Sequence, residues 1–448
     1  MAIGAYHLVN FIGILFGVYL TLYWLQRNGT RALAVQPLVW FSLFFSLIHF
    51  ITPSYKLVIR QYRYMTGYGE STLLLNAILS LAVFCFCAAI LARITTSQPP
   101  PSVAKSCNGP LHCVYSGIAG AVIALFSMFQ VEQAIATIGY DNFASDRILA
   151  SSQMGLYSRL DILILPSLAL FFAGILNIKR KKSPLYALLV LIIIYSVRYF
   201  SLVQSRNSIL LMFVIMVSIY CFYRPLQIRL SRTSFRIWLL GGVGILLLGY
   251  FAYATTIMRY ESINHSYAQE KLDNLFYHII DGSFGNDENL LWLTENDPDL
   301  LWGRTYLSGI TNLVPRALWP DKPWGAGPEL KNMIVPRSYV AGAEGNSSIT
   351  TGFLTEARMN FGIPGIFLVG MMWALVLRWL HRALRRSQTV FRETLIIYAQ
   401  VLAATAFVYA EFLGFFSNLM LCVIAMVLLR TVLAIVFKSN RPWVERYA

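Results

Sequence analysis

Charged residues are scarce in this chain of 448 residues, and acidic residues are scarcer than basic ones. Only 13% of the residues are Asp, Glu, Lys or Arg, whereas 57% are hydrophobic, and 21 acidic residues stand against 36 basic ones. Apolar runs that approach or exceed about 18 residues recur along the chain, which is typical of membrane spans and not of a soluble domain. The composition therefore predicts an all-α polytopic membrane protein.

Signals for metals, disulfides and nucleic acids are also missing. The six cysteines indicate neither a disulfide framework nor a metal site, and HExxH or paired His/Cys spacings do not occur. The DxD-like spacing Asp297-Pro298-Asp299 favours a turn over a metal site, and His49 is expected to be a hydrogen-bonded core residue. We therefore expect no metal and no cofactor. The net charge of +15 is a consequence of membrane topology and does not indicate nucleic-acid binding.

The apolar runs predict about eleven transmembrane helices, with boundaries that are good to about 2 to 4 residues. The predicted spans are 5–25, 33–52, 72–92, 111–130, 162–178, 184–203, 207–223, 237–258, 361–379, 393–412 and 414–436. If successive spans cross the membrane in opposite directions, about 21 of the 36 basic residues fall on one membrane face. The positive-inside rule identifies that face as cytoplasmic. The amino terminus is then outside, and the first helix is expected to be a retained span and not a signal peptide.

The connecting loops are unequal in length, and the long ones are on the outer face. Cytoplasmic connections are short, whereas outer segments cover about 53–71, 131–161 and 259–360. We expect three regions: eight membrane helices in 1–258, a large outer catalytic loop in 259–360, and three helices with a cytoplasmic tail in 361–448. An i, i+3, i+4, i+7 apolar stripe predicts an amphipathic helix on the bilayer within 270–279.

The stretch Asn312–Gly325, "NLVPRALWPDKPWG", combines three prolines and two tryptophans with charges. Proline excludes a regular helix and tryptophan settles at headgroup level, so one interpretation is an interfacial anchor. The other interpretation is that Arg304, Arg316 and Lys322 bind a lipid diphosphate. These residues lie on the outer face, where topology does not favour basic residues and where a lipid diphosphate would lie.

Two further arginines lie close to apolar spans. Arg206, in "VQSRNS", falls between two spans, where a charge costs about 2.5 to 3.5 kcal/mol near the bilayer centre and less near the interface. It either snorkels to the outer surface or has a functional role, and Arg198 shares these alternatives.

Three motifs in the order "QSRNSILL", "WGRTYLSGITNLVPRALWPDKP" and "NSSITTGFLTEARMNFGIPG" resemble the Wzy-type polymerases of lipid-linked oligosaccharide repeat units. The resemblance covers about residues 198–375 and the helix count. It implies a GT-C-like helical bundle in the bacterial inner membrane with a periplasmic catalytic loop. It also implies transfer of a growing glycan from undecaprenyl diphosphate onto an undecaprenyl-diphosphate-linked repeat unit, in O-antigen, common-antigen or exopolysaccharide synthesis.

Such a reaction needs positive charge near the diphosphate leaving group, because negative charge develops there. Since no metal site is indicated, we expect metal-independent catalysis in which arginine and lysine bind the diphosphate. The candidates are Arg206, Arg304, Arg316 and Lys322, of which Arg206 and Arg316 are favoured. Arg147 and Arg159 are candidates for a second diphosphate, although a solvated position suits them better.

The acceptor hydroxyl also needs a proton acceptor, and Glu356 is the first choice because it precedes the Gly362–Gly365 break at the membrane surface. Arg358 and Asn360 lie near it in sequence and are candidates for binding diphosphate or sugar. The alternative is that Glu356 and Arg358 are solvated charges at a helix end. His265, His278 and Asp281 are weaker alternatives for the base, and His278 is a further candidate for substrate binding.

Other functions stay open at this point. An O-antigen ligase would use the same carrier with lipid A core as acceptor, and a lipid-linked oligosaccharide flippase would not be an enzyme. An enzyme using polyprenyl monophosphate sugars would carry acidic residues in its first outer loop, which here offers Lys56, Arg60 and Arg63 with only Glu70. The expected partners are an undecaprenyl-diphosphate-linked oligosaccharide, the lipid bilayer and a chain-length regulator protein, with no nucleic acid.

Overall fold

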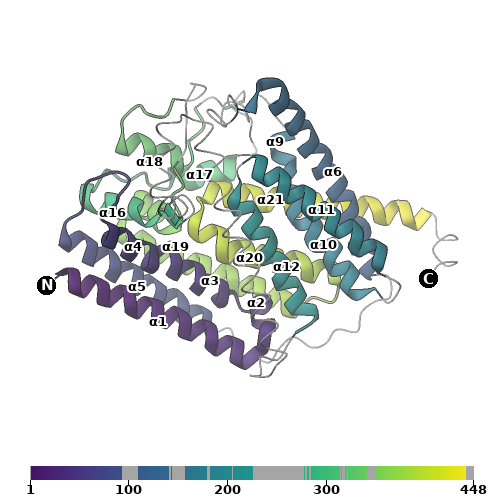
Figure 1. Cartoon of the computed structure of the whole chain (residues 1–448), viewed down its shortest axis with the longest axis horizontal. Helices are drawn as coiled ribbons and strands as arrows, with labels where there is room; N and C mark the ends of the chain where they lie inside the picture. The colour runs from purple at the N-terminus through teal and green to yellow at the C-terminus, as the bar shows by residue number, and fades with distance from the viewer. Residues whose placement is uncertain are drawn as a thin grey trace.

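The chain folds into a bundle of roughly parallel and antiparallel helices with shorter helices gathered at one end (Figure 1). This arrangement is taken from a computed structural model. It describes residues 2–92, 109–140, 143, 157–178, 182–203, 205–225, 277, 280, 281, 284–312, 314, 318, 319, 321–340 and 349–439. Every secondary-structure element within these residues is a helix, as an all-α membrane protein requires.

Long helices form most of the bundle. They are α1 (Ala2–Asn28), α3 (Pro37–Ser46), α4 (Thr52–Ile59), α5 (Glu70–Ala92), α6 (Gly109–Ile138), α10 (Ile164–Asn177), α11 (Ser183–Leu202), α12 (Arg206–Tyr223), α19 (Phe353–Arg385), α20 (Val390–Tyr409) and α21 (Phe412–Ser439). Short turns join some of them: η1 (Gly29–Arg31), α2 (Ala32–Val35), the π-turn η2 (Leu47–Ile51), α9 (Tyr157–Leu160) and η3 (Asp161–Leu163). Within the described ranges, seven helical stretches are long and apolar enough to cross a membrane. The protein is therefore an α-helical, multi-pass membrane protein.

Helices stand at ten of the eleven positions where hydropathy predicts spans, and the run 237–258 lies outside the described residues. Two of these helical stretches, Asp161–Asn177 and Asn207–Tyr223, are apolar but short. The seven stretches that meet the length and hydropathy requirement together do not confirm eleven spans.

Helix α20 lies at the centre of the bundle, against α3, α10, α12 and α19. Hydrogen bonds join it to two neighbours: the Gln400 amide donates to the Ala34 carbonyl at 3.0 Å, and the indole of Trp373 in α19 donates to the Ala403 carbonyl at 3.1 Å. Such bonds are needed because no water is available inside an apolar bundle.

Three local expectations change in the structure. The second predicted span does not end at residue 52, because the helix continues through the π-turn and α4 to Ile59 and carries Lys56 into the protein interior. Helix α19 begins at Phe353, eight residues before the predicted span, and its backbone breaks at Gly362 as the sequence predicts. His49 is buried as expected, but within the described residues neither ring nitrogen has a hydrogen-bond partner, so the prediction of a hydrogen-bonded histidine is wrong.

The described parts of the large loop form three short helices, α16 (Asp287–Asn296), α17 (Arg304–Thr311) and α18 (Ala326–Ile334). They gather near the start of α1 and the first turns of α19 and α21 (Figure 1). The predicted amphipathic helix in 270–279 lies almost entirely outside the described residues. The end of the bundle that carries α16 to α18 therefore holds the candidate site.

Glycine allows the closest helix contact in the bundle, between α6 and α10. A Cβ atom on Gly117 would stand 2.5 Å from the backbone nitrogen of Phe171, whereas one on Gly4 in α1 would meet nothing within 4 Å. Gly117→Ala should therefore lower the free energy of unfolding by about 1–3 kcal/mol through overpacking. Gly4→Ala is the control and should raise it by about 0.5–1 kcal/mol through helix propensity. Thermal unfolding in detergent micelles measures both, and equal midpoints for the two variants would contradict this packing.

Candidate functional site

Several residues that the sequence singles out cannot be placed. Arg316, Arg147 and His278 lie outside the described residues, as does the weaker candidate His265. Arg206 begins helix α12, but only its backbone is described. The site below is therefore built from Glu356, Asn360, Arg358, Arg304 and Lys322, with Arg198 elsewhere in the bundle.

Glu356 lies in the first turn of α19 and is fully buried. One carboxylate oxygen accepts a hydrogen bond from the Thr305 hydroxyl of α17 at 2.7 Å, and the other accepts one from the backbone N–H of Phe412 at 2.6 Å. Asn360, one turn further along α19, donates to the Thr305 hydroxyl at 2.8 Å. Glu356 therefore ties α17, α19 and the start of α21 together, and it is not the solvated helix-end charge of the alternative interpretation.

A second carboxylate, that of the half-buried Glu411, lies beside this junction. It accepts a hydrogen bond from the backbone N–H of Gly327 at 2.8 Å, at the N-terminus of α18, where a negative charge is favoured. Burial raises the pKa of Glu411, while the N–H groups of Gly327 and Ala326 oppose that rise. Because Glu411 acts electrostatically on Glu356, the junction concentrates negative charge in a buried place.

Arg358 and Asp297 join α19 to the end of α16. Their side chains form an ion pair, and Asp297 adopts the left-handed conformation that ends α16. Two backbone hydrogen bonds reinforce the contact, from Leu301 to Met359 at 2.9 Å and from Trp302 to Asn360 at 3.0 Å. The segment Asp297-Pro298-Asp299, predicted to be a turn, forms no regular turn: the chain leaves α16 through the left-handed Asp297, whose carboxylate pairs with Arg358.

Lys322 and Arg304 differ in how far their charges are available. Lys322 is buried, and its ammonium donates to three backbone carbonyl oxygens at 3.0 to 3.5 Å, those of Thr311, Asn312 and Val314. It therefore caps the C-terminal end of α17. The side chain of Arg304 is 54% exposed and stands 3.5 Å from the Glu329 carboxylate. Of these two cations, Arg304 is the one that a ligand can reach in this conformation.

Helix α17 has the reverse of the usual amphipathic pattern. Its small and polar residues Thr305, Ser308 and Gly309 are buried, whereas Leu307 and Ile310 are exposed. Trp302, just before the helix, is 78% exposed. We call the exposed residues Trp302, Arg304, Leu307, Ile310 and Val314 the α17 surface.

Helix α17 packs against the start of α21. Gly309 lies so close to Phe412 that a Cβ atom would stand 2.7 Å from its ring, and Asn312 donates to the Ser417 hydroxyl at 3.0 Å. Exposed apolar side chains of α21 occur further along the helix, from Ile424 to Val436, as suits contact with lipid. The combination of exposed apolar side chains with an exposed guanidinium is suited to an amphiphile that has an anionic headgroup.

Arg198 does not belong to this site. It lies on α11, where its guanidinium forms an ion pair with Glu132 of α6 at 3.3 Å. The contact is largely exposed on the arginine side, so it contributes little to stability.

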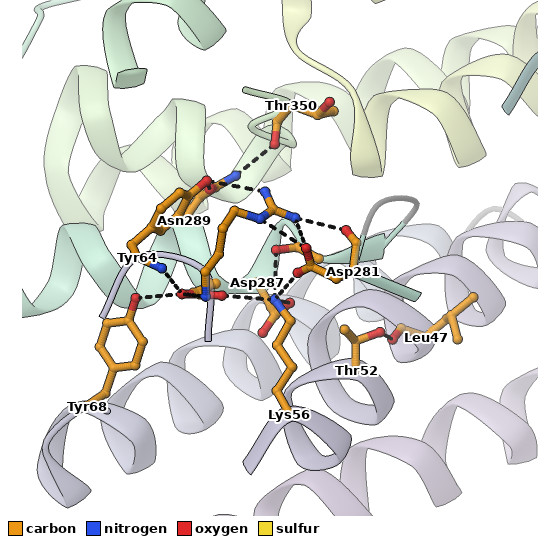
Figure 2. A network of polar contacts seen from close by, with 12 residues as sticks. Leu47, Thr52, Lys56, Tyr64, Tyr68, Asp281, Asp287, Asn289 and Thr350 are labelled. Carbon is orange, nitrogen blue, oxygen red and sulfur yellow. Dashed lines mark hydrogen bonds and ion pairs between the residues drawn. The ribbon is translucent and has the colours of Figure 1, made fainter. Parts of the chain in front are cut away.

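The largest polar cluster in the described part of the chain was missed by sequence reasoning (Figure 2). Lys56 of α4 is fully buried, and its ammonium contacts Asp281 at 2.7 Å, Glu288 at 3.1 Å and Asp287 at 3.5 Å. Arg63 contacts the other oxygen of Asp281 at 2.6 Å. We call these five residues the Lys56 cluster.

The Lys56 cluster fastens the first outer loop to α16. Glu288 accepts backbone hydrogen bonds from Arg63 at 2.6 Å and Tyr64 at 2.9 Å, and one from the Tyr68 hydroxyl at 3.1 Å. The next residue, Asn289, accepts from the Tyr64 hydroxyl and donates to the Thr350 carbonyl, both at 2.7 Å, just before α19 begins (Figure 2).

A signal for this cluster exists in the sequence. The first outer loop is basic, with Lys56, Arg60 and Arg63. The large loop contains the acidic residues Asp281, Asp287 and Glu288 close together in the sequence. Opposite charges on two loops of the same membrane face are a reason to expect contact. Hydropathy alone does not use that information.

Comparisons with known proteins identify no family for this chain. The chain matches no protein-family model, no curated protein and no solved structure.

The Thr305 hydroxyl is central to the Glu356 junction because it both donates to Glu356 and accepts from Asn360. Thr305→Val removes both bonds at nearly constant shape and should lower the free energy of unfolding by about 1–3 kcal/mol. Thr311→Val, at the exposed end of the same helix, is the matched control and should change it by less than about 0.5 kcal/mol. Thermal unfolding of the full chain compares the two, and equal losses would show that the Thr305 bonds contribute nothing specific.

Proposed function

We propose that this chain is a glycosyltransferase that polymerises lipid-linked oligosaccharide repeat units. In this proposal it transfers a growing glycan from undecaprenyl diphosphate onto an undecaprenyl-diphosphate-linked repeat unit. The chain lies in a bacterial inner membrane with α16 to α18 on the periplasmic side. A GT-C-like bundle is part of the proposal and rests on the sequence resemblance.

The observation that carries the proposal is the α17 surface beside α21. A polyprenyl chain needs an apolar surface close to the membrane, and Leu307 and Ile310 are exposed on α17, which packs against the start of α21. The diphosphate needs a cation at the end of that surface, and the exposed guanidinium of Arg304 stands there. Arginine suits this role because its planar fork matches phosphate oxygens.

The remaining predicted cations keep different roles in the proposal. Arg316 and Arg206 are proposed to bind diphosphate on the strength of the sequence motifs. Lys322 holds the end of α17 in place, and Arg358 holds the segment after α16, so both act on the site by positioning.

In the reaction, the acceptor hydroxyl oxygen bonds to the anomeric carbon of the growing glycan, and the bond from that carbon to the diphosphate oxygen breaks. Undecaprenyl diphosphate leaves with the bonding electrons, and nearby cations stabilise its added charge. The proton of the acceptor hydroxyl passes to a base, for which we propose Glu356.

Glu356 is fully buried, with its carboxylate between the Thr305 hydroxyl and the Phe412 backbone, so an acceptor hydroxyl can reach it only if a neighbouring element moves. The proposal therefore includes a displacement of α17 when both substrates are bound. Buried carboxylates of this kind bind a proton more readily than solvated ones, which suits a base.

Polymerase activity is tested directly with purified full-length protein in nanodiscs and one defined undecaprenyl-diphosphate-linked repeat unit, with a chelator present. We expect a ladder of longer lipid-linked glycans. Arg304→Gln should lower kcat/KM by about 10- to 100-fold, the value of a charge-assisted hydrogen bond. Arg337→Gln, which removes an exposed arginine beyond α18, is the control and should leave kcat/KM unchanged.

Three outcomes of this assay contradict the proposal. One is the absence of any product longer than a single repeat unit. Another is product that forms only when lipid A core is supplied, which would indicate a ligase. The third is activity that requires added magnesium or manganese.

The role of Glu356 is tested by Glu356→Gln, which keeps the shape and one hydrogen-bond acceptor. Turnover should fall by about 100- to 10,000-fold, the range of a positioned general base, while binding of the lipid-linked unit is retained. Glu295→Gln, at an exposed glutamate of α16, is the matched control and should retain full turnover. Near-wild-type turnover of the Glu356 variant would leave Glu356 with the tethering role alone.

A further inference from the structure

The Lys56 cluster does not balance its charges. Lys56 and Arg63 supply two positive charges, whereas Asp281, Asp287 and Glu288 supply three negative ones. When all five groups are ionised, one negative charge is left over in a place where Lys56, Asp287 and Glu288 are shielded from solvent. A net buried charge is unfavourable unless something neutralises it.

The surplus charge belongs to Asp287, because the other two carboxylates are well bonded. Asp281 contacts both cations, and Glu288 contacts Lys56 and accepts three hydrogen bonds. Asp287 is 0% exposed and has only the Lys56 ammonium, at 3.5 Å from one oxygen. Within the described part of the chain, neither of its oxygens accepts a hydrogen bond.

Two phenols face the same carboxylate from other elements. The charge of Asp287 acts on Tyr6 of α1 and on Tyr62 of the first outer loop. Within the described residues, the buried Tyr62 hydroxyl has no hydrogen-bond partner, whereas Asn10 is close enough to Tyr6 to interact with its hydroxyl. An unsatisfied buried carboxylate near an unsatisfied buried hydroxyl is unlike the rest of this cluster, since buried polar groups are normally paired.

We propose that Asp287 is a proton-binding site, at which one proton neutralises the Lys56 cluster. The proton adds to a carboxylate oxygen of Asp287, and its uptake leaves three carboxyl groups with two negative charges against two cations. The protonated group can then donate a hydrogen bond, which the carboxylate cannot do.

The groups around Asp287 account for the pH at which this happens. They are Tyr6 of α1, Lys56 of α4, Tyr62, Arg63 and Tyr68 of the first outer loop, Asp281, and Glu288 of α16. Burial raises the pKa of Asp287 from 3.8 to about 6; Lys56 and Arg63 oppose the rise, and Glu288 and Asp281 add to it. In contrast, burial of Asp281 is outweighed by Arg63 and Lys56, so the pKa of Asp281 is lowered.

The contact between the first outer loop and α16 therefore weakens as pH rises. A carboxyl with a raised pKa in the folded state stabilises the fold fully below its unfolded value, near pH 4, and loses that contribution as pH rises through about 6. The cluster holds α16, and Asn289 of α16 bonds to Thr350 just before α19 begins. Proton release from the cluster therefore weakens the contact that holds the start of α19, the helix that carries Glu356.

The test substitutes each carboxylate by its neutral isostere and measures thermal unfolding of the full chain in nanodiscs at about pH 5 and about pH 8. Asp287→Asn mimics the protonated state, so its midpoint should exceed that of the wild type by a few degrees at about pH 8, with the difference shrinking at about pH 5. Asp281→Asn and Glu288→Gln are the matched controls. Each strips a partner from Lys56 or Arg63 and should lower the midpoint at both pH values.

The proposal is overturned if Asp287→Asn lowers the midpoint, leaves it unchanged, or shifts it equally at both pH values. Infrared spectroscopy supplies a second measurement that does not depend on stability. The protonated-carboxyl C=O band at about pH 5 should be weaker in Asp287→Asn than in the wild type, because the variant lacks one protonated carboxyl. Equal bands in the two proteins, together with stabilisation of the wild type by sodium but not by choline at about pH 8, would assign the site to a metal cation and overturn the proton.

Discussion

A lysine ammonium buried at one end of an apolar bundle holds α16 to the segment that follows α4. Lys56 reaches this position because α4 continues the second long helix beyond the predicted span. A charge without water needs opposite charges from the protein itself, and these come from residues more than two hundred positions later. Electrostatics therefore fastens α16 in addition to the apolar packing of Leu291 against Leu73 and Tyr68.

The Glu356 junction likewise supplies a buried charge with partners from the protein, among α17, α19 and the start of α21. A buried carboxylate takes its hydrogen bonds from a hydroxyl of α17 and a backbone N–H at the start of α21. Since one carboxylate satisfies both, α17 is fixed with its polar side inward. The apolar side of α17 then faces outward, where only a lipid environment favours it.

The Lys56 cluster and the Glu356 junction are linked through α19. Asn289, next to Glu288 in α16, bonds to the backbone at Thr350, six residues before Glu356. In the proposed reaction, α17 must move for a substrate to reach Glu356, while α16 and the entry to α19 stay fastened. That movement would break the Thr305 bonds and the packing of Tyr306 against Phe361 and Phe412.

Sequence patterns by themselves determined the long apolar helices and the break at Gly362, because backbone hydrogen bonding and glycine conformation are local properties. They also determined the membrane class, since apolar runs of that length have no other stable environment. Tertiary structure alone decided which charges are buried. The sequence assigned Lys56 to a loop and Glu356 to the membrane surface, yet both are fully enclosed. Their partners lie far away in the chain, and the free energy of a buried charge depends on those partners, which hydropathy and spacing do not encode.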